Sequence, residues 1–438
     1  MPEAGVDERA TYARVTWRLL PILFLCYVIA YLDRVNVGFA KLQMLHDLRF
    51  SEATYGLGAG IFFIGYCCFE LPSNLLLSRF GARRWMARIM VTWGIISACM
   101  LFVRTPASFY TMRCLLGVAE AGMFPGVIFY LTFWYPAWRR GRMVALFMTA
   151  QPVSGVIGGP LSGWILQQFN GVRHLAGWQW LFLLEALPAI AMGVVLFFWL
   201  DDGIHDARWL SEAEKSLLLG HLEAEAQHKE SYHSILGVLR NRWVWLLSLI
   251  TFSSVMGLYG ISFWLPTIIK ATGITKPLSI GLLTMIPYGA AAVAMILVSR
   301  SADRSGERRW HLALSTTAGG LGLIFATIFA GDTALSLAGL TLATAGIITS
   351  QPLFWSLPTA FLGGTAAAAG IALINTAGNS AGFVSPYVIG WISSATQSTR
   401  AGMYVLAGSL FLGSALTLLV PKKLVERGRA IETTTKAS

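Results

Sequence analysis

Long apolar runs recur along the chain and are separated by short polar segments. The runs lie near residues 18–38, 55–77, 85–104, 107–131, 143–167, 178–200, 243–269, 278–299, 311–330, 334–356, 364–392 and 402–420. As a helix, each run can cross about 30 Å of hydrocarbon at a rise of about 1.5 Å per residue. Because lipid offers the backbone no hydrogen bonds, each run must satisfy its own peptide groups, as a helix does. The pattern therefore predicts an all-α polytopic membrane protein with twelve transmembrane helices.

The composition of the 438-residue chain agrees with this prediction. It is 55% hydrophobic and 13% charged, whereas soluble domains carry about 25% charged residues. The net charge of +11 raises the question of nucleic-acid binding. The basic residues, however, stand between the apolar runs and form no continuous basic domain. We therefore exclude a nucleic-acid partner and expect a lipid bilayer around most of the chain.

The distribution of basic residues predicts the orientation of the chain. Most of the 33 Lys and Arg residues fall on one side of the expected membrane, together with both chain ends. The other side carries only Lys41, Arg49, Arg104, Arg173, Lys270, Lys276 and Arg400. Because cytoplasmic loops are enriched in Lys and Arg, we expect both termini in the cytoplasm. The sequence contains no Asn-x-Ser/Thr sequon, which favours a bacterial membrane over a glycosylated surface.

A short basic motif occurs twice, about half the chain apart. Residues 79–84 and 304–309 both read Arg-x-Gly-x-Arg-Arg, and each follows the second run of a set of six. The repeat predicts two pseudo-symmetric six-helix halves of the same orientation, as in transporters built from parallel repeats. We interpret the two motifs as cytoplasmic gates with the residues Arg79, Gly81, Arg84, Asp303, Arg304, Gly306 and Arg309.

The same pattern divides the chain into five parts. We expect a cytoplasmic tail (1–17), an N-terminal six-helix bundle (18–200), a cytoplasmic linker (201–242), a C-terminal six-helix bundle (243–421) and a second cytoplasmic tail (422–438). Within the linker, Ser211 and Glu214 form a capping box, which predicts a short amphipathic helix with a structural role.

The few ionisable residues inside the apolar runs are the best candidates for chemistry, because such groups are costly at bilayer depth and are usually functional. Asp33 lies about 21 Å from the inner end of the first helix, and Arg113 about 10 Å below the outer end of the fourth. Asp33, Arg34 and Arg113 therefore share one level. Glu120 follows Arg113 by two turns on the same face, about 10 Å deeper. We expect a ladder in a central cavity, with Asp33 and the two arginines above Glu120.

This set of residues suits proton-coupled transport of an anion. Arginine stays charged and presents a fork of donors that matches a carboxylate. A substrate that competes for this arginine changes the proton affinity of the neighbouring acid. Asp33 and Glu120 are therefore the candidate proton-coupling residues, and Arg34 and Arg113 the candidate anion-binding or coupling residues. The alternative is a static ion-pair network that only holds the helices together.

Other polar residues in the runs are secondary candidates. Glu70 and Glu185 lie nearer the ends of their runs, where helix-end contacts or gating account for them. A further set of mid-run residues could line the cavity, although packing is the plain explanation for the aromatic ones. These candidate substrate contacts are Tyr31, Tyr66, Gln151, Tyr259, Trp355 and Asn375. An amide at that depth needs a partner, which strengthens Gln151 and Asn375.

Several motifs are absent, and their absence excludes other classes of protein. The sequence has no Gly-x-x-x-x-Gly-Lys-Ser/Thr motif for ATP, and its seven histidines are scattered without metal-ligand spacing. A Gly-x-Ser-x-Gly match at 378–382 lies in an apolar run, without the strand-to-helix turn that a hydrolase needs. We therefore expect neither an enzyme nor a metal or cofactor, with the proton gradient as the driving force.

The twelve runs, the half-repeat and the paired loop motifs resemble the major facilitator superfamily. The first motif has Ser78 where that superfamily usually has aspartate, while Asp303 fits in the second. Within the superfamily, the chain is similar to the anion:cation symporter family, including bacterial tartrate, phthalate, hydroxyphenylacetate and sugar-acid permeases. The segments that carry this similarity are 31–36, 70–74, 113–120, 159–163, 180–185, 357–361 and 375–379.

The resemblance implies roles for particular residues. Asp33 and Glu120 would carry protons, and Arg34 and Arg113 would bind the anion or tune those acids. Tyr31, Tyr66, Gln151, Trp355 and Asn375 would contact the substrate, a tartrate-like dicarboxylate or an aromatic carboxylate. We accordingly expect a monomeric symporter of the bacterial inner membrane that takes up a small organic anion with protons. The alternatives are a proton-coupled antiporter or exporter of organic anions or drugs, and a polytopic membrane sensor that transports nothing.

Overall fold

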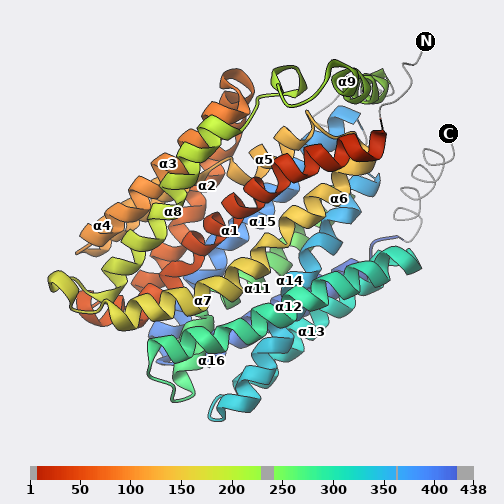
Figure 1. Ribbon diagram of the computed structural model, residues 1–438. Helices are drawn as coiled ribbons and strands as arrows, with labels where there is room; N and C mark the ends of the chain where they lie inside the picture. Colours follow the sequence, from red (N-terminus) through yellow and green to blue (C-terminus); the bar gives the residue numbers. More distant parts are fainter. Residues whose placement is uncertain (1–6, 228–240, 362–363, 422–438) are drawn as a thin grey trace.

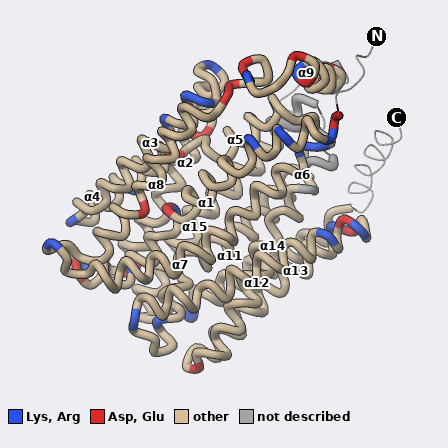
Figure 2. The backbone as a smooth tube through the Cα atoms, in the orientation of Figure 1, with Lys and Arg blue, Asp and Glu red and all other residues tan. Residues whose placement is uncertain are grey.

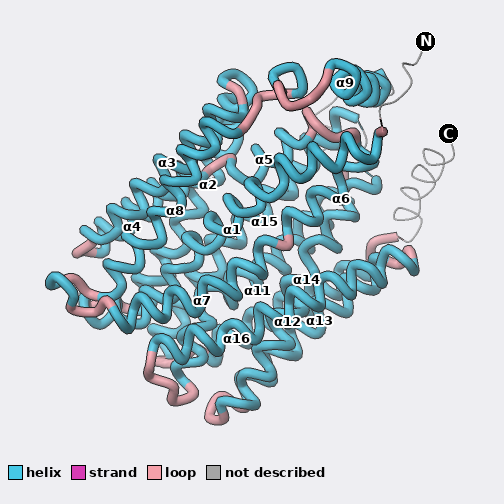
Figure 3. The backbone as a smooth tube through the Cα atoms, viewed as in Figure 1, coloured by secondary structure: helices cyan, strands magenta, loops and turns pink. Residues whose placement is uncertain are grey.

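The computed structural model describes residues 7–227, 241–361 and 364–421, and these residues are helical almost throughout, with no strand among them (Figures 1 and 3). Eleven of their helical segments have the length and hydropathy to cross a membrane. The remaining long helix, α15 (Gly364–Thr396), has 33 residues and is also long enough. The prediction of twelve transmembrane helices in an all-α fold is therefore confirmed.

The twelve spans form two sets of six, with the linker helix between them. The first set is α1 (Glu8–Leu48), α2 (Glu52–Phe80), α3 (Ala82–Cys99), α4 (Pro106–Glu120) with α5 (Met123–Leu131), α6 (Ala137–Met148) with α7 (Ala150–Gln168), and α8 (Gly177–Trp199). The linker helix is α9 (Glu212–Gln227). The second set is α11 (Arg242–Ala271), α12 (Pro277–Ser305), α13 (Arg308–Ile328), α14 (Thr333–Phe361), α15 and α16 (Arg400–Leu418). In Figure 1 the two sets occupy the two sides of the bundle.

The helix boundaries differ from the apolar runs in two ways: one helix extends beyond its run, and one span is broken. The first helix has 41 residues and begins at the cap Asp7, because a helix continues into polar sequence beyond the hydrocarbon. The fourth span is broken in two at Gly122, whose φ of +89° suits glycine. A Cβ there would also collide with the Ser73 side chain of α2. Pro125 then falls in the first turn of α5, where its missing N–H costs nothing.

The bundle has two ends, which we name by the elements that form them. The terminus face holds the start of α1, the end of α8, helix α9 and the start of α11. The opposite face holds the loops 49–51, 169–176, 272–276 and 397–399. Charged residues gather at these two ends and are sparse in the middle of the bundle (Figure 2). Large apolar side chains are exposed around it, including Leu71 at 68% and Phe198 at 79%, as expected for surfaces that face lipid.

The two halves contact each other along three helix pairs, α2 with α15, α7 with α12, and α1 with α11. These contacts are closest toward the opposite face, where glycines let backbones meet. A Cβ added at Gly163 of α7 would lie 2.5 Å from the Pro277 carbonyl oxygen of α12, and one at Gly60 of α2 would lie 2.7 Å from the Phe383 oxygen of α15. The small-residue spacing of the sequence thus corresponds to close packing between the halves.

The linker helix packs on the terminus face of the N-terminal half. The capping box is formed, since the Ser211 backbone N–H donates to Glu214 Oε2 at 2.9 Å and the Glu214 N–H donates to Ser211 Oγ at 3.3 Å. Arg14 of α1 makes an ion pair with Glu214 at 2.7 Å, and the Tyr12 hydroxyl lies 3.0 Å from His221 Nδ1. The described part of the linker up to residue 227 therefore makes these contacts with the N-terminal half.

Candidate functional site

The middle of α1 is the longest run of buried residues in the part of the chain that the structure describes. Every residue from Cys26 to Lys41 is buried, because α1 packs against α7 and α8 of its own half and against α11 of the other. Neighbouring residues on a helix point about 100° apart. The adjacent acid and base, Asp33 and Arg34, therefore face different neighbours, and the structure places them in two separate clusters.

Arg34 lies at the boundary between the halves and forms an ion pair with Glu120. Its Nε and Nη2 both donate to Glu120 Oε1, the first at 3.1 Å. Its Nη1 donates to the Tyr259 hydroxyl of α11 at 3.0 Å. The guanidinium also lies 5.5 Å from the Phe62 ring and 5.3 Å from the Tyr66 ring. One arginine therefore links an acid of the N-terminal half with a tyrosine of the C-terminal half.

Glu120 is the last residue of α4, directly before the break at Gly122. The C-terminal end of a helix disfavours a negative charge, and Glu120 is fully buried. The Arg34 cation offsets both costs. Glu120 Oε2 has no hydrogen-bond partner among the described residues, which leaves this oxygen available to a proton or a ligand. The sequence places Glu120 about 10 Å deeper than the level that Arg34 shares with Arg113. The Arg34 side chain is long enough to span this difference in depth and reach Glu120 directly.

Arg113 is fully buried and has no acid bonded to it within the described residues. Its Nε donates to the Gly58 carbonyl at 3.3 Å and its Nη2 to the Ala59 carbonyl at 3.5 Å, both on α2. Its guanidinium lies 5.0 Å from the Phe62 ring, so Phe62 separates the two buried arginines. Arg113 Nη1 has no partner in the described chain and could bind an anion.

Asp33 faces α3, away from Arg34. Its carboxylate accepts hydrogen bonds from the Trp93 indole N–H, from the Ser97 hydroxyl at 2.6 Å and from the Asn36 amide at 2.9 Å. Arg113 acts on it only electrostatically. Asp33 therefore lies inside the N-terminal half, whereas Glu120 lies at the contact between the halves. The structure does not bring these two predicted proton-coupling residues into direct contact.

The six candidate substrate contacts fall into four places. The Tyr31 hydroxyl accepts from Gln151 Nε2 at 2.9 Å and lies 3.1 Å from Ser262 Oγ of the other half. Tyr66 and Tyr259 lie against Arg34, as described above. Asn375 donates to Glu70 Oε1 at 2.6 Å, and Trp355 packs on Phe354, with ring centroids 5.5 Å apart. Five of the six thus lie in polar clusters between the halves, and Trp355 lies among apolar residues of the C-terminal half.

The basic loop motifs form tight turns at the terminus face. Gly81 and Gly306 both have positive φ, +87° and +69°, which explains the shared glycine. In the second motif, Asp303 pairs with Arg308 at 3.3 Å and Arg309 donates to the Val420 carbonyl at 2.9 Å. Arg79 and Arg304 lie in the last turns of α2 and α12, and Arg84 lies in the first turn of α3.

The first motif obtains its acid from elsewhere in the chain. Ser78 holds the position where an aspartate is usual, and Asp202, after α8, lies against Gly81 instead. Asp202 Oδ1 accepts from the Arg83 backbone N–H at 2.8 Å. Sequence reasoning missed this residue because Asp202 and Gly81 are 121 positions apart.

Sequence reasoning also missed other polar partners near the site. Asn379 donates to Glu70 Oε2 at 3.1 Å, one helix turn beyond Asn375. Near the opposite face, buried Lys41 pairs with Glu52 at 2.6 Å and lies 3.3 Å from the Trp264 ring of the other half. Lys41 lies just beyond its apolar run, so hydropathy did not mark it. Within the described ranges, no group of three or more His, Cys, Asp or Glu residues is placed to hold a metal ion.

Two six-helix halves that meet around a buried ion pair define a polytopic transport protein. The chain belongs to the Major Facilitator Superfamily, whose sequence profile matches residues 23–386. Members of this family are transporters, so the chain is not an enzyme.

Similar proteins and structures agree with this assignment. The chain is 49% identical to the "Putative metabolite transport protein NicT" of Pseudomonas putida, over 96% of each chain. It is 47% identical to a "Putative tartrate transporter" of Agrobacterium vitis, over 96% of this chain and 97% of the relative. It is 42% identical to a "Quinolone resistance transporter" of Acinetobacter baumannii, over 95% and 96%. The xylose transporter XylE from E. coli, in a partially occluded inward open conformation, superposes with a TM-score of 0.71 at 14% identity, over 93% of this chain and 99% of that one.

Proposed function

We propose that this protein is a proton-coupled symporter that takes up a small organic anion across a bacterial inner membrane. The observation that carries the proposal is the buried contact of Arg34 with Glu120 and Tyr259, which places a permanent cation and an acid where the two halves meet. A static ion pair would need only the two charges. The unpartnered Glu120 Oε2 and the bond to the other half favour a pair that changes partners during transport.

The proposed coupling is an exchange of partners at Arg34. When Glu120 is ionised, it occupies the guanidinium fork and leaves no room for a second carboxylate. A proton on Glu120 removes its charge, and Arg34 then binds the carboxylate of the substrate with the same fork. Release of the proton on the other side of the membrane restores the ion pair and expels the anion. Arg113, which has one free N–H group, would hold the second charge of a dicarboxylate.

The orientation follows from the basic residues. We place the terminus face in the cytoplasm, since the Lys and Arg residues of the sequence are concentrated in its segments. The hydrogen bonds between described residues of the two halves extend from the opposite face, where the Ala53 N–H donates to Ser394 at 2.8 Å, no further than Glu70. The structure would then represent a state closed toward the outside.

The substrate class rests on the relatives and on the lining of the site. A tartrate-like dicarboxylate or an aromatic carboxylate fits two buried arginines, Arg34 and Arg113, with Tyr31 and Gln151 as donors to further polar groups. In this proposal the proton gradient supplies the energy without a cofactor, and the monomer is the transporting unit.

Uptake into proteoliposomes tests the proposal. Protein reconstituted with the opposite face outward should accumulate labelled tartrate or hydroxyphenylacetate when the outside is made acidic, and should not do so without the gradient. Asp33→Asn and Glu120→Gln should abolish accumulation against a gradient while retaining some exchange of labelled for unlabelled anion. Accumulation by either variant would refute the role assigned to that residue, and accumulation by the wild type without a proton gradient would refute symport.

The second candidate function is proton-coupled export. The similarity to a quinolone resistance transporter favours it, and the same Arg34–Glu120 exchange would serve an antiporter. The direction of coupled movement separates the two. An exporter would load a fluoroquinolone into inverted vesicles energised with an acidic lumen and would ignore tartrate.

A further inference from the structure

Glu185, in the middle of α8, is a buried acid that the proposed coupling does not use. It is 2% exposed, and the Ser162 hydroxyl of α7 donates to its Oε1 at 2.7 Å. Its Oε2 has no well-formed hydrogen-bond partner among the described residues. A carboxylate buried among neutral donors alone is strongly disfavoured, and such groups are stable when neutral or paired. Glu185 therefore needs either a cation or a proton.

Among the residues that the structure describes, no Lys or Arg is bonded to Glu185. The charged residues that act on this cluster are Asp33 of α1 and, through Asp33, Arg113 of α4. Helices α3 and α7 contribute only the neutral side chains of Trp93, Ser97 and Ser162. Glu185 therefore differs from Glu120, which is paired with Arg34 of α1.

Asn36 connects Glu185 to Asp33. The Asn36 amide donates to Asp33 Oδ1 at 2.9 Å and also contacts the Glu185 carboxyl. Asn36 Oδ1, like Glu185 Oε2, has no well-formed partner in the described chain. Glu185 therefore has only neutral partners, Ser162 and Asn36. A proton on Glu185 would remove its buried charge and give the cluster one more donor.

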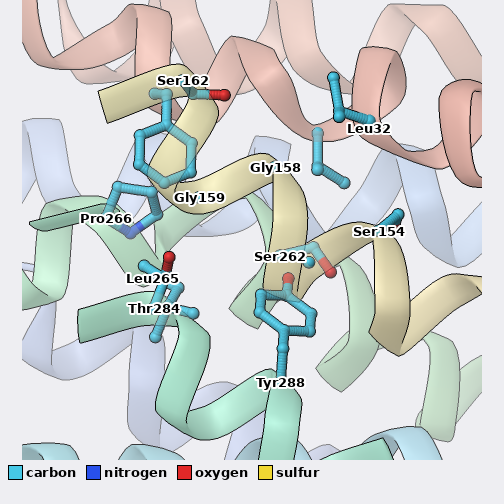
Figure 4. A pocket seen from close by; sticks show the side chains of 13 residues that line it. Leu32, Ser154, Gly158, Gly159, Ser162, Ser262, Leu265, Pro266, Thr284 and Tyr288 are labelled. Atoms are coloured by element: carbon cyan, nitrogen blue, oxygen red, sulfur yellow. The ribbon is translucent and has the colours of Figure 1, made fainter. Parts of the chain in front are cut away.

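Ser162 gives this cluster access to the boundary between the halves. It lines a small cavity between α1, α7, α11 and α12, together with Ser154, Ser262, Thr284 and Tyr288 (Figure 4). Tyr288 and Ser262 lie side by side at this cavity, so hydroxyl groups from both halves line it (Figure 4). The Ser162 hydroxyl thus stands between the cavity and the Glu185 carboxyl, where it can relay a proton.

We propose that Asp33 and Glu185 form a second proton site inside the N-terminal half, joined by Asn36 and loaded through Ser162. In the loading step, the Ser162 hydroxyl passes its proton to Glu185 and regains one from a hydronium ion that enters the cavity, which leaves water; unloading reverses both transfers. The site acts beside the Arg34–Glu120 pair, so a transport cycle carries at least two protons. This inference rests on the proposed symport and deepens it.

The number of protons carried per anion tests the inference. In proteoliposomes that hold a fixed tartrate gradient, the membrane potential or pH gradient at which net flux stops gives this ratio, whatever the rate. The wild type should carry at least two protons, and Glu185→Gln should carry one fewer. Glutamine offers Ser162 an acceptor and Asn36 a donor, as the protonated acid would, so a purely structural role predicts an unchanged ratio.

Two controls keep the outcomes distinct. Glu185→Asp retains an acid and should retain the wild-type ratio. A wild-type ratio of one proton, or an unchanged ratio in Glu185→Gln, would overturn the second site while leaving symport intact. Wild-type tartrate flux that moves no protons would instead refute the proposed function itself. If Glu185→Gln does not fold, a wild-type ratio below two protons would still overturn the second site, which requires at least two.

Discussion

Glu120 and Glu185 are both buried in the N-terminal half, yet their surroundings differ in kind. Glu120 lies at the end of α4, bonded to Arg34, which also reaches Tyr259 of the other half. Glu185 lies within one half, bonded to a serine and in contact with an asparagine. An acid beside a cation at a moving boundary can exchange partners with an anion. An acid among neutral donors can only gain or lose a proton. The surroundings of Glu120 therefore suit anion coupling, and those of Glu185 suit proton storage.

The largest expected effect on stability is at the Arg34–Glu120 pair. Arg34→Ala or Glu120→Ala leaves a buried charge without its partner, which should cost about 3–5 kcal/mol of unfolding free energy. The double variant should cost much less than the sum. Glu185→Ala, by contrast, loses hydrogen bonds of a neutral group and should cost about 1–3 kcal/mol. Denaturation in detergent, followed by tryptophan fluorescence, measures all four variants. Equal losses of unfolding free energy in Glu120→Ala and Glu185→Ala would contradict this difference between the two acids.

The next effect concerns the geometry of the two buried arginines. Arg34→Lys should reduce tartrate uptake at least tenfold, because one ammonium group cannot bond Glu120 and Tyr259 while offering a fork to the substrate. Arg113→Lys should reduce uptake less, since its bonds go to the carbonyls of Gly58 and Ala59, which an ammonium can also reach. Initial rates at several tartrate concentrations measure both. Wild-type affinity in Arg34→Lys would contradict anion binding by its fork.

A smaller effect is expected at the opposite face. Lys41 pairs with Glu52 and lies against Trp264 of the other half, and a desolvated cation–π contact is worth about 2 kcal/mol. Lys41→Gln should therefore open this face at least about tenfold more often. The labelling rate of Ala53→Cys by a membrane-impermeant maleimide, in a background without other cysteines, reports this opening. Arg49→Gln, which changes a charge in the nearby loop, should leave the rate unaltered.

The smallest effect is expected where Glu70 joins the halves. Its two oxygens accept from Asn375 and Asn379 of α15. Glu70→Gln keeps one acceptor and loses the charge, so it should weaken this contact by about 1 kcal/mol. Asn379→Ala removes the same hydrogen bond from the other side and should have a similar effect on exchange rate. A loss of proton coupling in Glu70→Gln, absent from Asn379→Ala, would show that Glu70 also carries a proton.

The sequence predicts much of this arrangement, and the limits have physical causes. Hydropathy and the repeated Arg-x-Gly-x-Arg-Arg motif predict twelve helices in two halves, because lipid forces helix formation and length. Depth along a helix follows from its rise, which places Asp33, Arg34 and Arg113 correctly as buried mid-span charges. Rotation about the helix axis depends on tertiary packing. The pairing of Arg34 with Glu120, and of Asp33 with Trp93 and Ser97, could therefore not be predicted.

Breaks and distant partners were equally hard to foresee. The break that ends α4 at Glu120 depends on a contact between two different spans, the close approach of Ser73 of α2 to Gly122. Asp202 lies at the turn of the first motif although it is 121 positions from Gly81 in the sequence. The predicted tail over 422–438 and part of the linker, residues 228–240, lie outside the described residues.

The most direct test of coupling at Arg34 and Glu120 asks whether a tartrate gradient drives protons across the membrane. Proteoliposomes with a trapped pH-sensitive dye, equal pH on both sides and an inward tartrate gradient should acidify their lumen when they contain the wild type. Glu120→Gln should admit no protons, although it still exchanges labelled tartrate at a reduced rate. Tartrate entry into wild-type liposomes without any change in lumenal pH would contradict coupling at Arg34 and Glu120.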